Sequence, residues 1–431
     1  MYKAVIARVK TRPHPNADRL QLGMIAGEQV IVGLETKDGE LMAYFPADGQ
    51  LALGFAEAND LISRTNPTTG AREGGYFAKN CRVRAQKLRG EKSEGFACEL
   101  AKLTAAGVSQ ETVSGLKEGD EFVELDDIEI CRKFIAPATR EAQANRAKKS
   151  AKKNPMFKEH LDTGHFHRDL GKIPDGALLW VTEKLHGTSA RYSLCKDIVE
   201  KPKSWFRKLL RMEPKTEAGW FRYVGTRRTS WKLGESKSDG YYGTHAFRED
   251  FMHDVWHLLK KGETLYGEIV GYTNGLSPVM NSPATKDIGD KGFIKKYGER
   301  IVYTYGCAPA EHRFFIYRIT QTNEDGYAVD LSWPQVKTRS AELGLPHVPE
   351  LAPPFYYTRD KMRELEELVA PLVDGESTLD SRHIREGVVI RIEKGAEIHA
   401  LKNKSFDFKV LEGLAKDSGQ VDLEEAEEAS A

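Results

Sequence analysis

Short apolar runs separated by polar turn clusters dominate residues 1–130. Four of these runs have the length and composition of strands, and they span residues 4–9, 29–34, 41–45 and 95–98. Glycine, proline, asparagine and aspartate separate them, as is typical of turns. Many short strands over this length predict a small β-barrel or sandwich.

Farther along the chain, the apolar runs carry isolated charged residues. The runs that predict strands span residues 177–181, 265–271, 314–319 and 385–391. In the third, alternation would place Phe315 and Tyr317 on one face. Glu268 and Glu386 stand in or beside such strands, where burial of a carboxylate costs free energy unless it is paired. We therefore expect these two glutamates to have partners.

Two stretches of the chain are strongly basic. Between Arg132 and Lys158, nine lysines or arginines face a single acid, which marks a domain boundary. Its alanines favour a helix that Pro155 should end, and its surface could either face phosphates or serve as a soluble linker. Residues 201–215 mix basic residues with Trp205 and could clamp a nucleic acid strand. An amphipathic helix that packs its apolar residues inward is the favoured alternative there.

Composition restricts the class of protein. At 431 residues, with 40% hydrophobic and 30% charged residues, the chain predicts a soluble protein of two or three domains. Its formal net charge of zero gives no global positive field for a nucleic acid. Five cysteines without a Cys-x-x-Cys pair argue against a zinc knuckle or a disulfide framework. Without a long apolar stretch or a signal-peptide pattern, we expect a cytoplasmic protein, and residues 416–431 should form an acidic, disordered tail.

Lys184 is the first candidate for chemistry. It follows the predicted strand at 177–181 and precedes Gly187, which permits a tight turn close to a ligand. A lysine in a partly desolvated pocket loses part of its preference for the ammonium form, and the neutral amine can attack phosphorus. The pattern Lys-x-x-Gly is weak by itself, because a lysine before a turn is usually a solvated surface residue.

Further segments in a fixed order strengthen this candidate. They are Thr226-Arg227-Arg228-Thr229, Tyr266-Gly267-Glu268-Ile269, Phe315-Ile316-Tyr317-Arg318, Glu386-Gly387-Val388-Val389 and Leu401-Lys402-Asn403-Lys404. Together with Lys184-Leu185-His186-Gly187 they resemble motifs I to V of the covalent nucleotidyltransferase superfamily, which includes polynucleotide ligases and mRNA capping enzymes. The ordered matches extend over more than 200 residues.

The resemblance implies a role for each charged position. Lys184 would attack the α-phosphorus of ATP and form a lysyl-adenylate. Lys402, Lys404 and a divalent metal, Mg²⁺ or Mn²⁺, held near Glu386 would stabilise charge on the phosphate oxygens. Arg318 stands where many relatives carry an acid, so a metal role at that position does not transfer. The set of nucleotide-binding residues would be completed by three residues of motif I and the residue before it, namely Leu185, His186, Gly187 and Glu183.

The remaining motif residues would bind the nucleoside. Glu268 would accept a hydrogen bond from the ribose, and Arg227 or Arg228 would contact ribose or phosphate. Tyr317 is the preferred surface for adenine, with Phe315 as the alternative. Two structural alternatives stay open, since Tyr317 could belong to the core and Arg228 could pair with a carboxylate.

Motif I and the order of domains favour RNA ligases within the superfamily. Lys-Leu-His-Gly-Thr resembles the RNA-repair ligases, whereas DNA ligases usually show Lys-x-Asp-Gly. Only 29 residues follow Lys402, too few for a C-terminal OB domain. Residues 14–20 and 87–95 instead resemble a tRNA-binding OB module, although both could be simple turn sequences. An OB module before the catalytic domain, with the approach sequences at 160–166 and 173–176, resembles the Deinococcus-type RNA ligases.

A histidine run precedes the predicted catalytic strand. His160, His165 and His167 could suggest a metal site, but a structural or phosphate-facing role is favoured.

These observations predict an α+β protein with an N-terminal OB-like β-barrel and a mixed α/β, ATP-grasp-like nucleotidyltransferase domain of antiparallel sheets. The expected boundaries are 1–130 for the OB domain, 131–158 for the basic linker, 159–415 for the catalytic domain and 416–431 for the tail. We expect an ATP-dependent RNA ligase that acts as a monomer on RNA or RNA-containing nicked duplexes, for nick repair. The alternatives are an ATP-dependent DNA ligase and a non-catalytic protein that binds RNA ends.

Overall fold

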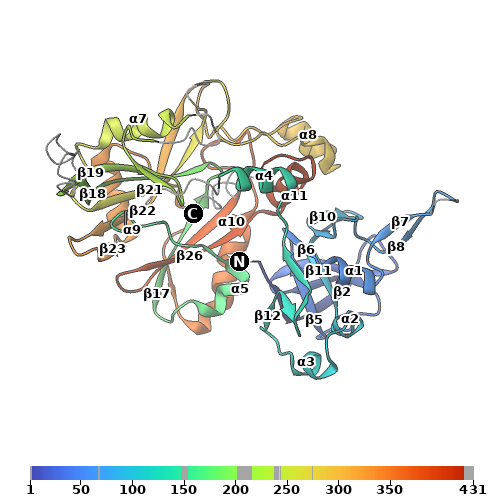
Figure 1. Cartoon of the computed structure of the whole chain (residues 1–431). Helices are drawn as coiled ribbons and strands as arrows, with labels where there is room; N and C mark the ends of the chain where they lie inside the picture. Colours follow the sequence, from blue (N-terminus) through green and yellow to red (C-terminus); the bar gives the residue numbers. More distant parts are fainter. Residues whose placement is uncertain are drawn as a thin grey trace, which may run out of the picture. The chain divides into compact units, whose positions relative to one another are not determined.

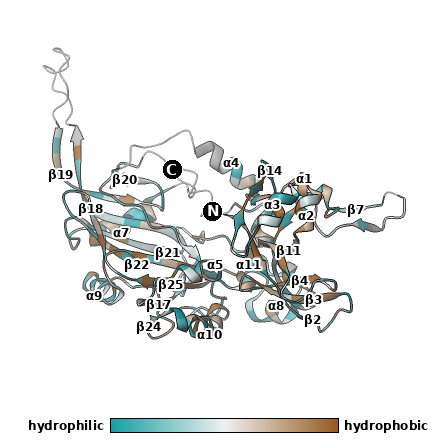
Figure 2. Cartoon of the chain, turned by 90° about the horizontal axis from the view of Figure 1, so that it is seen from below, coloured by the Kyte–Doolittle hydropathy of each residue, from teal (hydrophilic) through white to brown (hydrophobic). Residues whose placement is uncertain are grey.

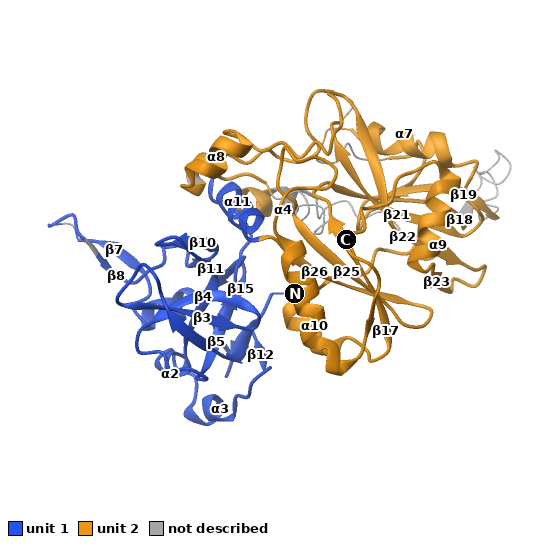
Figure 3. Ribbon diagram, turned by 180° about the vertical axis from the view of Figure 1, so that it is seen from behind, with its two compact units in different colours: residues 1–136, 406–418 blue, residues 137–405, 419–431 orange. Residues whose placement is uncertain are grey.

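The computed structural model describes residues 2–66, 68–146, 154–200, 216–236, 242, 244–273 and 275–421. It divides into two compact units (Figure 3). Unit 1 comprises residues 1–136 and 406–418, and unit 2 comprises residues 137–405 and 419–431. The basic stretch 201–215 lies outside the described residues, as do residues 147–153 of the basic linker and 422–431 of the tail.

Unit 1 consists mainly of short antiparallel strands (Figure 1). Its largest sheet has the order β10-β11-β5-β1-β12, and the members are β10 (Ala85–Leu88), β11 (Glu91–Glu99), β5 (Leu41–Pro46), β1 (Ala4–Arg8) and β12 (Glu121–Phe122). Two three-stranded sheets join β2 (Lys10–Pro13), β3 (Leu20–Ile25) and β4 (Glu28–Gly33), and β15 (Cys131–Lys133), β6 (Gly49–Leu51) and β9 (Arg82–Val83). The four strands predicted between residues 4 and 98 are therefore confirmed.

The described strands of unit 1 form separate sheets rather than one closed barrel. The predicted OB-like barrel is therefore not confirmed. The smaller elements are β7 (Ser63–Thr65), β8 (Arg72–Gly74), β13 (Glu124–Leu125), β14 (Ile128–Glu129), α1 (Leu53–Ala58), α2 (Ala101–Ala105) and α3 (Gln110–Gly115). An apolar core that includes Phe45, Phe55 and Leu103 holds these elements together.

Helix α11 (Phe406–Asp417) belongs to unit 1, although it follows the last strand of unit 2 after a single residue. The predicted catalytic domain, by contrast, ran to residue 415. Lys409 of α11 reaches two acids of unit 1: its Nζ lies 3.1 Å from Glu28 Oε1 and also contacts Glu94. Phe406 and Leu411 are buried on the same helix. These tertiary contacts have no signature in the local sequence of the helix.

Unit 2 contains two antiparallel sheets. The six-stranded sheet has the order β20-β19-β18-β21-β22-β23, with β20 (Ser230–Lys232), β19 (Thr216–Gly225), β18 (Thr188–Glu200), β21 (Glu263–Gly271), β22 (His312–Thr322) and β23 (Ala328–Asp330). The five-stranded sheet has the order β16-β26-β25-β17-β24, with β16 (Gly164–His165), β26 (Ile398–Lys404), β25 (Gly387–Glu393), β17 (Ala177–Lys184) and β24 (Phe355–Tyr357). Only the short β16–β26 pair among these described strands is parallel.

Helices and turns complete unit 2. They are α4 (Pro137–Arg146), α5 (Phe166–Asp169), α7 (Ala246–Val255), α8 (Lys291–Tyr297), α9 (Trp333–Leu343), α10 (Met362–Val373) and the 3₁₀ turns Leu170–Lys172, Lys286–Ile288 and Arg359–Lys361. Helix α10 buries Leu365, Val369 and Val373, which are four residues apart and share one side. Part of the helix is coloured hydrophilic in Figure 2, and Arg363, Glu364 and Glu367 are exposed there. The mixed α/β class with antiparallel sheets is confirmed.

All five cysteines are buried and free, and burial raises the pKa of Cys307 to about 11. In the part of the chain that the structure describes, every helix is too short or too polar to cross a membrane.

Candidate functional site

Three neighbouring strands bring two lysines to one buried glutamate. Lys184 ends β17 and pairs with Gly387 at the start of β25, and Gly387 pairs in turn with Lys404 at the end of β26. The Lys184 Nζ lies 2.8 Å from Oε1 of Glu386, and the Lys404 Nζ lies 3.4 Å from the same oxygen. The Glu386 side chain is 1% exposed. The buried glutamate predicted to need a partner therefore has two.

Electrostatics keep the Glu386 carboxylate ionised. Burial alone would raise the pKa of Glu386, but Lys184, Lys404 and His186 together hold it below the ordinary value. His186 Nδ1 lies 3.7 Å from the second carboxylate oxygen. One carboxylate between two ammonium groups leaves a local excess of positive charge, which suits a phosphate.

The residues around Glu386 do not fit a metal ion held by the protein alone. No group of three potential ligands occurs among the described histidines, cysteines, aspartates and glutamates. The Glu386 carboxylate already faces Lys184 and Lys404, and a dication in direct contact would repel both ammonium groups. The metal role predicted for Glu386 therefore has no support in this arrangement.

Gly187 allows the turn after Lys184 to approach β21 closely. A Cβ at this position would stand 2.3 Å from the carbonyl oxygen of Ile269, so any other residue would have to displace backbone. Leu185 is buried beside it. The backbone N–H of His186 donates to Tyr305 Oη at 2.6 Å, and the His186 ring packs edge-on against Tyr303.

Glu183 points to the opposite face of β17 from Lys184. Adjacent strand residues point to opposite faces, so Glu183 and Lys184 cannot share one pocket. The Glu183 carboxylate is buried and accepts hydrogen bonds from the backbone N–H and Oγ1 of Thr378, at 2.9 and 2.5 Å. Glu183 was predicted to bind nucleotide, but its contacts fit a structural role, in which it holds the backbone next to motif I.

The six-stranded sheet brings Glu268, Phe315 and Tyr317 together. Glu268 on β21 lies opposite Ser189 on β18 and Phe315 on β22. The Tyr317 Oη lies 3.0 Å from Ser189 Oγ, so both aromatic residues share the face of Glu268, as alternation predicted. Phe315 is buried, whereas Tyr317 keeps partial exposure. Of the two, Tyr317 is the better placed to offer a ring face to a ligand.

The chain contains a bulge at Tyr317. The register of β21 and β22 shifts between Tyr266 and Gly267, which leaves Tyr317 as an extra residue opposite this step. Consequently Arg318 faces the same side as Tyr317, and its guanidinium lies 4.7 Å from the Tyr266 ring while pairing with Asp330 at 2.6 Å. Arg318 is thus engaged by a carboxylate of the fold.

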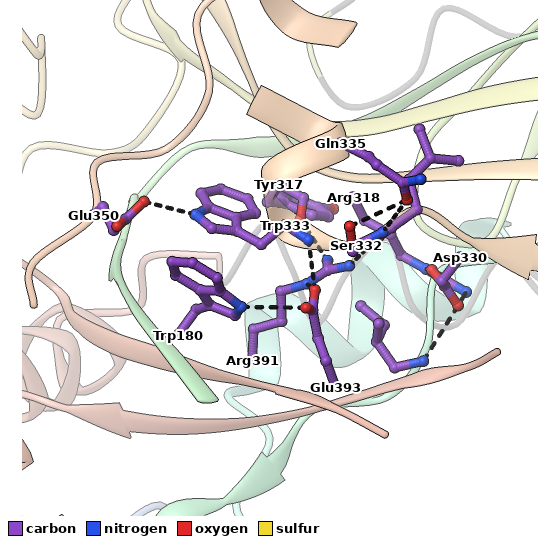
Figure 4. Close-up of polar contacts among 12 residues, drawn as sticks. Trp180, Tyr317, Arg318, Asp330, Ser332, Trp333, Gln335, Glu350, Arg391 and Glu393 are labelled. Atoms are coloured by element: carbon purple, nitrogen blue, oxygen red, sulfur yellow. Dashed lines mark hydrogen bonds and ion pairs between the residues drawn. The ribbon is translucent and has the colours of Figure 1, made fainter. Parts of the chain in front are cut away.

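A polar network supports the backbone of Tyr317 and joins the two sheets of unit 2 (Figure 4). Arg391 on β25 donates to the carbonyl oxygen of Tyr317 at 3.4 Å and pairs with Glu393 at 2.6 Å. The Glu393 carboxylate also accepts from the Trp333 backbone N–H at 2.6 Å and from Trp180 Nε1 at 3.2 Å. Tyr317 is therefore tied to β17, which ends at Lys184, and to β25, which begins directly after Glu386.

Arg227 and Arg228 pair with carboxylates of the approach segment. Both donate to Asp162 Oδ1, at 2.9 and 2.8 Å, and Arg228 also reaches Glu159 at 2.9 Å. Burial opposes ionisation of Asp162, but the two arginines hold its pKa below the ordinary value. The open alternative in which Arg228 pairs with a carboxylate is the one that the structure shows.

The three histidines of the approach segment do not form one cluster. His160 packs against Tyr317 with ring centroids 4.8 Å apart, and burial together with nearby arginines lowers the pKa of His160 well below its ordinary value. His165 on β16 instead lies opposite Lys402 on the neighbouring strand β26. His167 Nε2 lies 3.2 Å from the Asn403 side-chain amide. Lys402 and Lys404 are two residues apart on the same strand and share its face, as predicted.

Several residues that build the site lie outside the recognised motifs. Ser189, Tyr305 and Thr378 contact Tyr317, His186 and Glu183 respectively. Tyrosine, serine and threonine in loops and strands carry no distinctive sequence signal. The one available signal was Glu183 itself, an acid just after an apolar run, which needs a partner when it is buried.

Comparisons with known proteins identify the family. The model of the RNA ligase family matches residues 177–410, which is more than half of the chain. None of the curated proteins matches the sequence. Among solved structures, the chain resembles the Naegleria gruberi RNA ligase in several forms. A lysine-to-alanine variant with ATP and Mn shows a TM-score of 0.54 and 17% identity, over 96% of this chain and 99% of that one.

Two further forms of the Naegleria protein give the same result. A lysine-to-methionine variant with AMP and Mn shows a TM-score of 0.56 and 17% identity, over 94% of this chain and 98% of that one. The form with pyrophosphate shows a TM-score of 0.54 and 18% identity, over 94% of this chain and 97% of that one. At these identities the likeness demonstrates a shared fold, while the family model covers the segment from Lys184 to Lys404. The chain belongs to the RNA ligase family.

Proposed function

We propose that this protein joins RNA ends by an ATP-dependent reaction that passes through an adenylate on Lys184. One observation carries the proposal: Lys184 and Lys404 converge on the single buried carboxylate of Glu386, at 2.8 and 3.4 Å. With this convergence, a Lys184 nucleophile would lie beside an excess of positive charge. That combination suits attack on a phosphate.

In the first step, the neutral Lys184 amine would attack the α-phosphorus of ATP. A phosphorus–nitrogen bond forms, the bond from the α-phosphorus to the bridging oxygen breaks, and pyrophosphate leaves. The proton lost from Lys184 can pass to Oε1 of Glu386, which lies within hydrogen-bond distance. Lys404, and Lys402 on the same strand face, would stabilise charge on the phosphate oxygens.

In the second step, the AMP group would move from Lys184 to the 5′-phosphate of an RNA or DNA strand. In the third, a 3′-hydroxyl attacks that activated 5′-phosphate, a phosphodiester forms and AMP leaves. Both steps are phosphoryl transfers, so positioning and positive charge supply most of the acceleration. The family model supports RNA as the substrate.

The nucleoside would occupy the face shared by Glu268 and Tyr317. Glu268 would accept from the ribose and the partly exposed Tyr317 would stack on adenine, with Phe315 too buried to compete. For Arg227 or Arg228 to contact the ribose or a phosphate, each would have to exchange its bond to Asp162.

ATP as the cofactor is supported by the Naegleria structures with ATP, with AMP and with pyrophosphate. The structures with ATP and with AMP also contain Mn, and we propose that Mg²⁺ or Mn²⁺ reaches this chain bound to the nucleotide phosphates. There it would neutralise phosphate charge.

The finer assignment is to the Deinococcus-type RNA ligases, with unit 1 as an OB-like module that precedes the catalytic unit. Motif order, the histidine of motif I and the strand-rich unit 1 support it. A role in repairing nicks whose 3′-hydroxyl end is RNA follows from that resemblance. We propose a monomer that acts in the cytoplasm.

The test uses α-labelled ATP and a panel of nicked duplexes that differ only in the sugar at each side of the nick. The wild type should become covalently labelled and should seal nicks with RNA at the 3′-hydroxyl side. Lys184→Ala should abolish labelling, whereas Lys172→Ala, at an exposed lysine paired with Asp169, should retain it. Labelling of the Lys184→Ala variant would refute the nucleophile. Preference for an all-DNA nick would favour a DNA ligase, and absence of labelling in the wild type would favour a non-catalytic RNA-end-binding protein.

A further inference from the structure

Tyr305 is a buried tyrosine in a strained backbone conformation next to motif I. Its φ is +50°, in the left-handed region that side chains other than glycine rarely adopt. Its ring is fully buried, and its phenol oxygen accepts the backbone N–H of His186 at 2.6 Å. Strain of this kind persists only where surrounding contacts enforce it, and it is concentrated at functional sites.

Asp380 enforces this conformation by bonding to both neighbours of Tyr305. Its Oδ2 accepts from Thr304 Oγ1 at 3.0 Å and from the Gly306 backbone N–H at 3.1 Å. Arg382 adds a charge-assisted bond at 2.8 Å. Burial opposes ionisation of Asp380, but these donors hold its pKa well below the ordinary value. The carboxylate therefore stays charged throughout the neutral range and keeps the loop in place.

The loop that carries Asp380 also holds the other flank of the nucleophile. Thr378, two residues earlier, donates twice to the Glu183 carboxylate. We name residues 376–384 the clamp loop. Its ends meet in a bridge between Glu376 and Ile384, so it forms a closed unit, and it leads directly to motif IV.

The clamp loop thus reaches the residues on both sides of Lys184. It contacts Glu183 directly through Thr378, and it contacts His186 through Asp380 and Tyr305. Two anchored flanks restrict the backbone from which Lys184 extends. Attack on phosphorus depends on distance and direction, and a shift of about 1 Å can cost on the order of a hundredfold in rate.

We propose that Tyr305 is a positioning residue that aligns Lys184 for attack, with its phenol oxygen as the working group and the clamp loop as its support. This inference rests on the proposed function, because it concerns the adenylylation of Lys184. It assigns Tyr305, Thr378 and Asp380 a role that none of the sequence motifs contains.

The experiment measures single-turnover labelling from α-labelled ATP in full-length Tyr305→Phe. Phenylalanine keeps the ring and removes only the oxygen that accepts from His186. The matched control is Tyr357→Phe, at another fully buried tyrosine whose phenol oxygen has no hydrogen-bond partner in the structure. Sealing of a pre-adenylylated strand, which bypasses attack by Lys184, is measured in parallel.

For Tyr305→Phe we expect the labelling rate constant at saturating ATP to fall by roughly tenfold or more. The ATP concentration at half-maximal rate and the sealing of the pre-adenylylated strand should each change less than about threefold, because neither depends on the attack by Lys184. Tyr357→Phe should label at the wild-type rate. A merely structural role would lower both reactions together.

Equal rates for Tyr305→Phe and Tyr357→Phe would overturn the inference, as would an equal loss in labelling and sealing. If Tyr305→Phe does not fold, Thr378→Val decides, since it removes one donor to Glu183 and should show the same selective loss. A wild-type labelling rate in Thr378→Val would then refute the clamp. The wild type, measured alongside with Lys184→Ala as the unlabelled reference, separates this failure from a failure of the proposed function, because only the latter leaves the wild type unlabelled.

Discussion

Replacing Lys409 with methionine should weaken the packing of helix α11 against the rest of unit 1. The Lys409 side chain is 12% exposed and serves two carboxylates, Glu28 at 3.1 Å and Glu94. Removing one partner from a buried ion pair typically costs about 3–5 kcal/mol, since it leaves uncompensated buried charge. In Lys409→Met two acids would remain without their cation, so the upper part of that range applies at alkaline pH.

The loss should depend on pH through Glu94. Burial raises the pKa of Glu94 to about 7 although Lys409 lowers it, and the nearby Glu28 adds to the rise. Between about pH 4.5 and 7 the folded state therefore binds a proton that the unfolded state has released, so stability decreases as pH rises through this range. Without Lys409 the pKa of Glu94 rises further. The destabilisation should thus be larger at pH 8 than at pH 6, by at least about 1 kcal/mol.

The assay must distinguish the two units. The sequence has no tryptophan in residues 1–136 or 406–418, so tryptophan emission does not follow unit 1. Hydrogen exchange of peptides from residues 406–417, corrected for intrinsic rates at pH 6 and pH 8, reports the opening of α11 directly. Lys3→Met is the matched control, because Lys3 pairs with Glu121 at the surface of the same unit and should cost less than about 1 kcal/mol. Equal protection in the two variants, or a loss no greater at pH 8 than at pH 6, would refute the reasoning.

Two further predictions concern the active site. In Gly187→Ala the new Cβ would stand 2.3 Å from the Ile269 carbonyl oxygen, so single-turnover labelling from ATP should fall by at least about tenfold. Tryptophan emission should stay native. Labelling at the wild-type rate would contradict the steric argument. In Glu386→Gln the side chain keeps its shape but loses the charge that Lys184 and Lys404 share, and labelling should fall about a hundredfold. A loss of less than threefold would show that the carboxylate is dispensable.

Strand positions were predictable where apolar runs are continuous. The run at 177–181 became β17, and the predicted strands at 265–271 and 314–319 became β21 and β22. Periodicity also placed Phe315 and Tyr317 on one face, although the bulge at Tyr317 could not be foreseen. A bulge is set by the pairing of two distant strands, and the extra residue Tyr317 is neither glycine nor proline, although Gly267 stands at the shift in the partner strand.

Long-range polar partners were beyond the reach of the sequence. A buried glutamate at Glu386 predicted some partner, and the ordered motifs suggested lysines, so the core of the site was predictable. The partner of Glu183 was not, because Thr378 lies 195 residues away in a segment without a motif. Helix α11 was assigned to the catalytic domain for the same reason, since Lys409 recognises Glu28 and Glu94 only in the folded chain.

Strand register explains how residues more than 200 positions apart come to share one carboxylate oxygen. Lys184 opposes Gly387, and Gly387 opposes Lys404, so the two lysines flank the strand that begins one residue after Glu386. A Cβ at Gly387 would stand 2.1 Å from the carbonyl oxygen of Asn403, so glycine is what allows β25 and β26 to approach this closely. A slip of β17 by one residue would turn Lys184 to the opposite face and bring Glu183 toward Glu386. Two carboxylates would then face each other where an ammonium and a carboxylate now pair. The charges of Lys184, Lys404 and Glu386 therefore also disfavour a one-residue slip, because that pairing would bring like charges together.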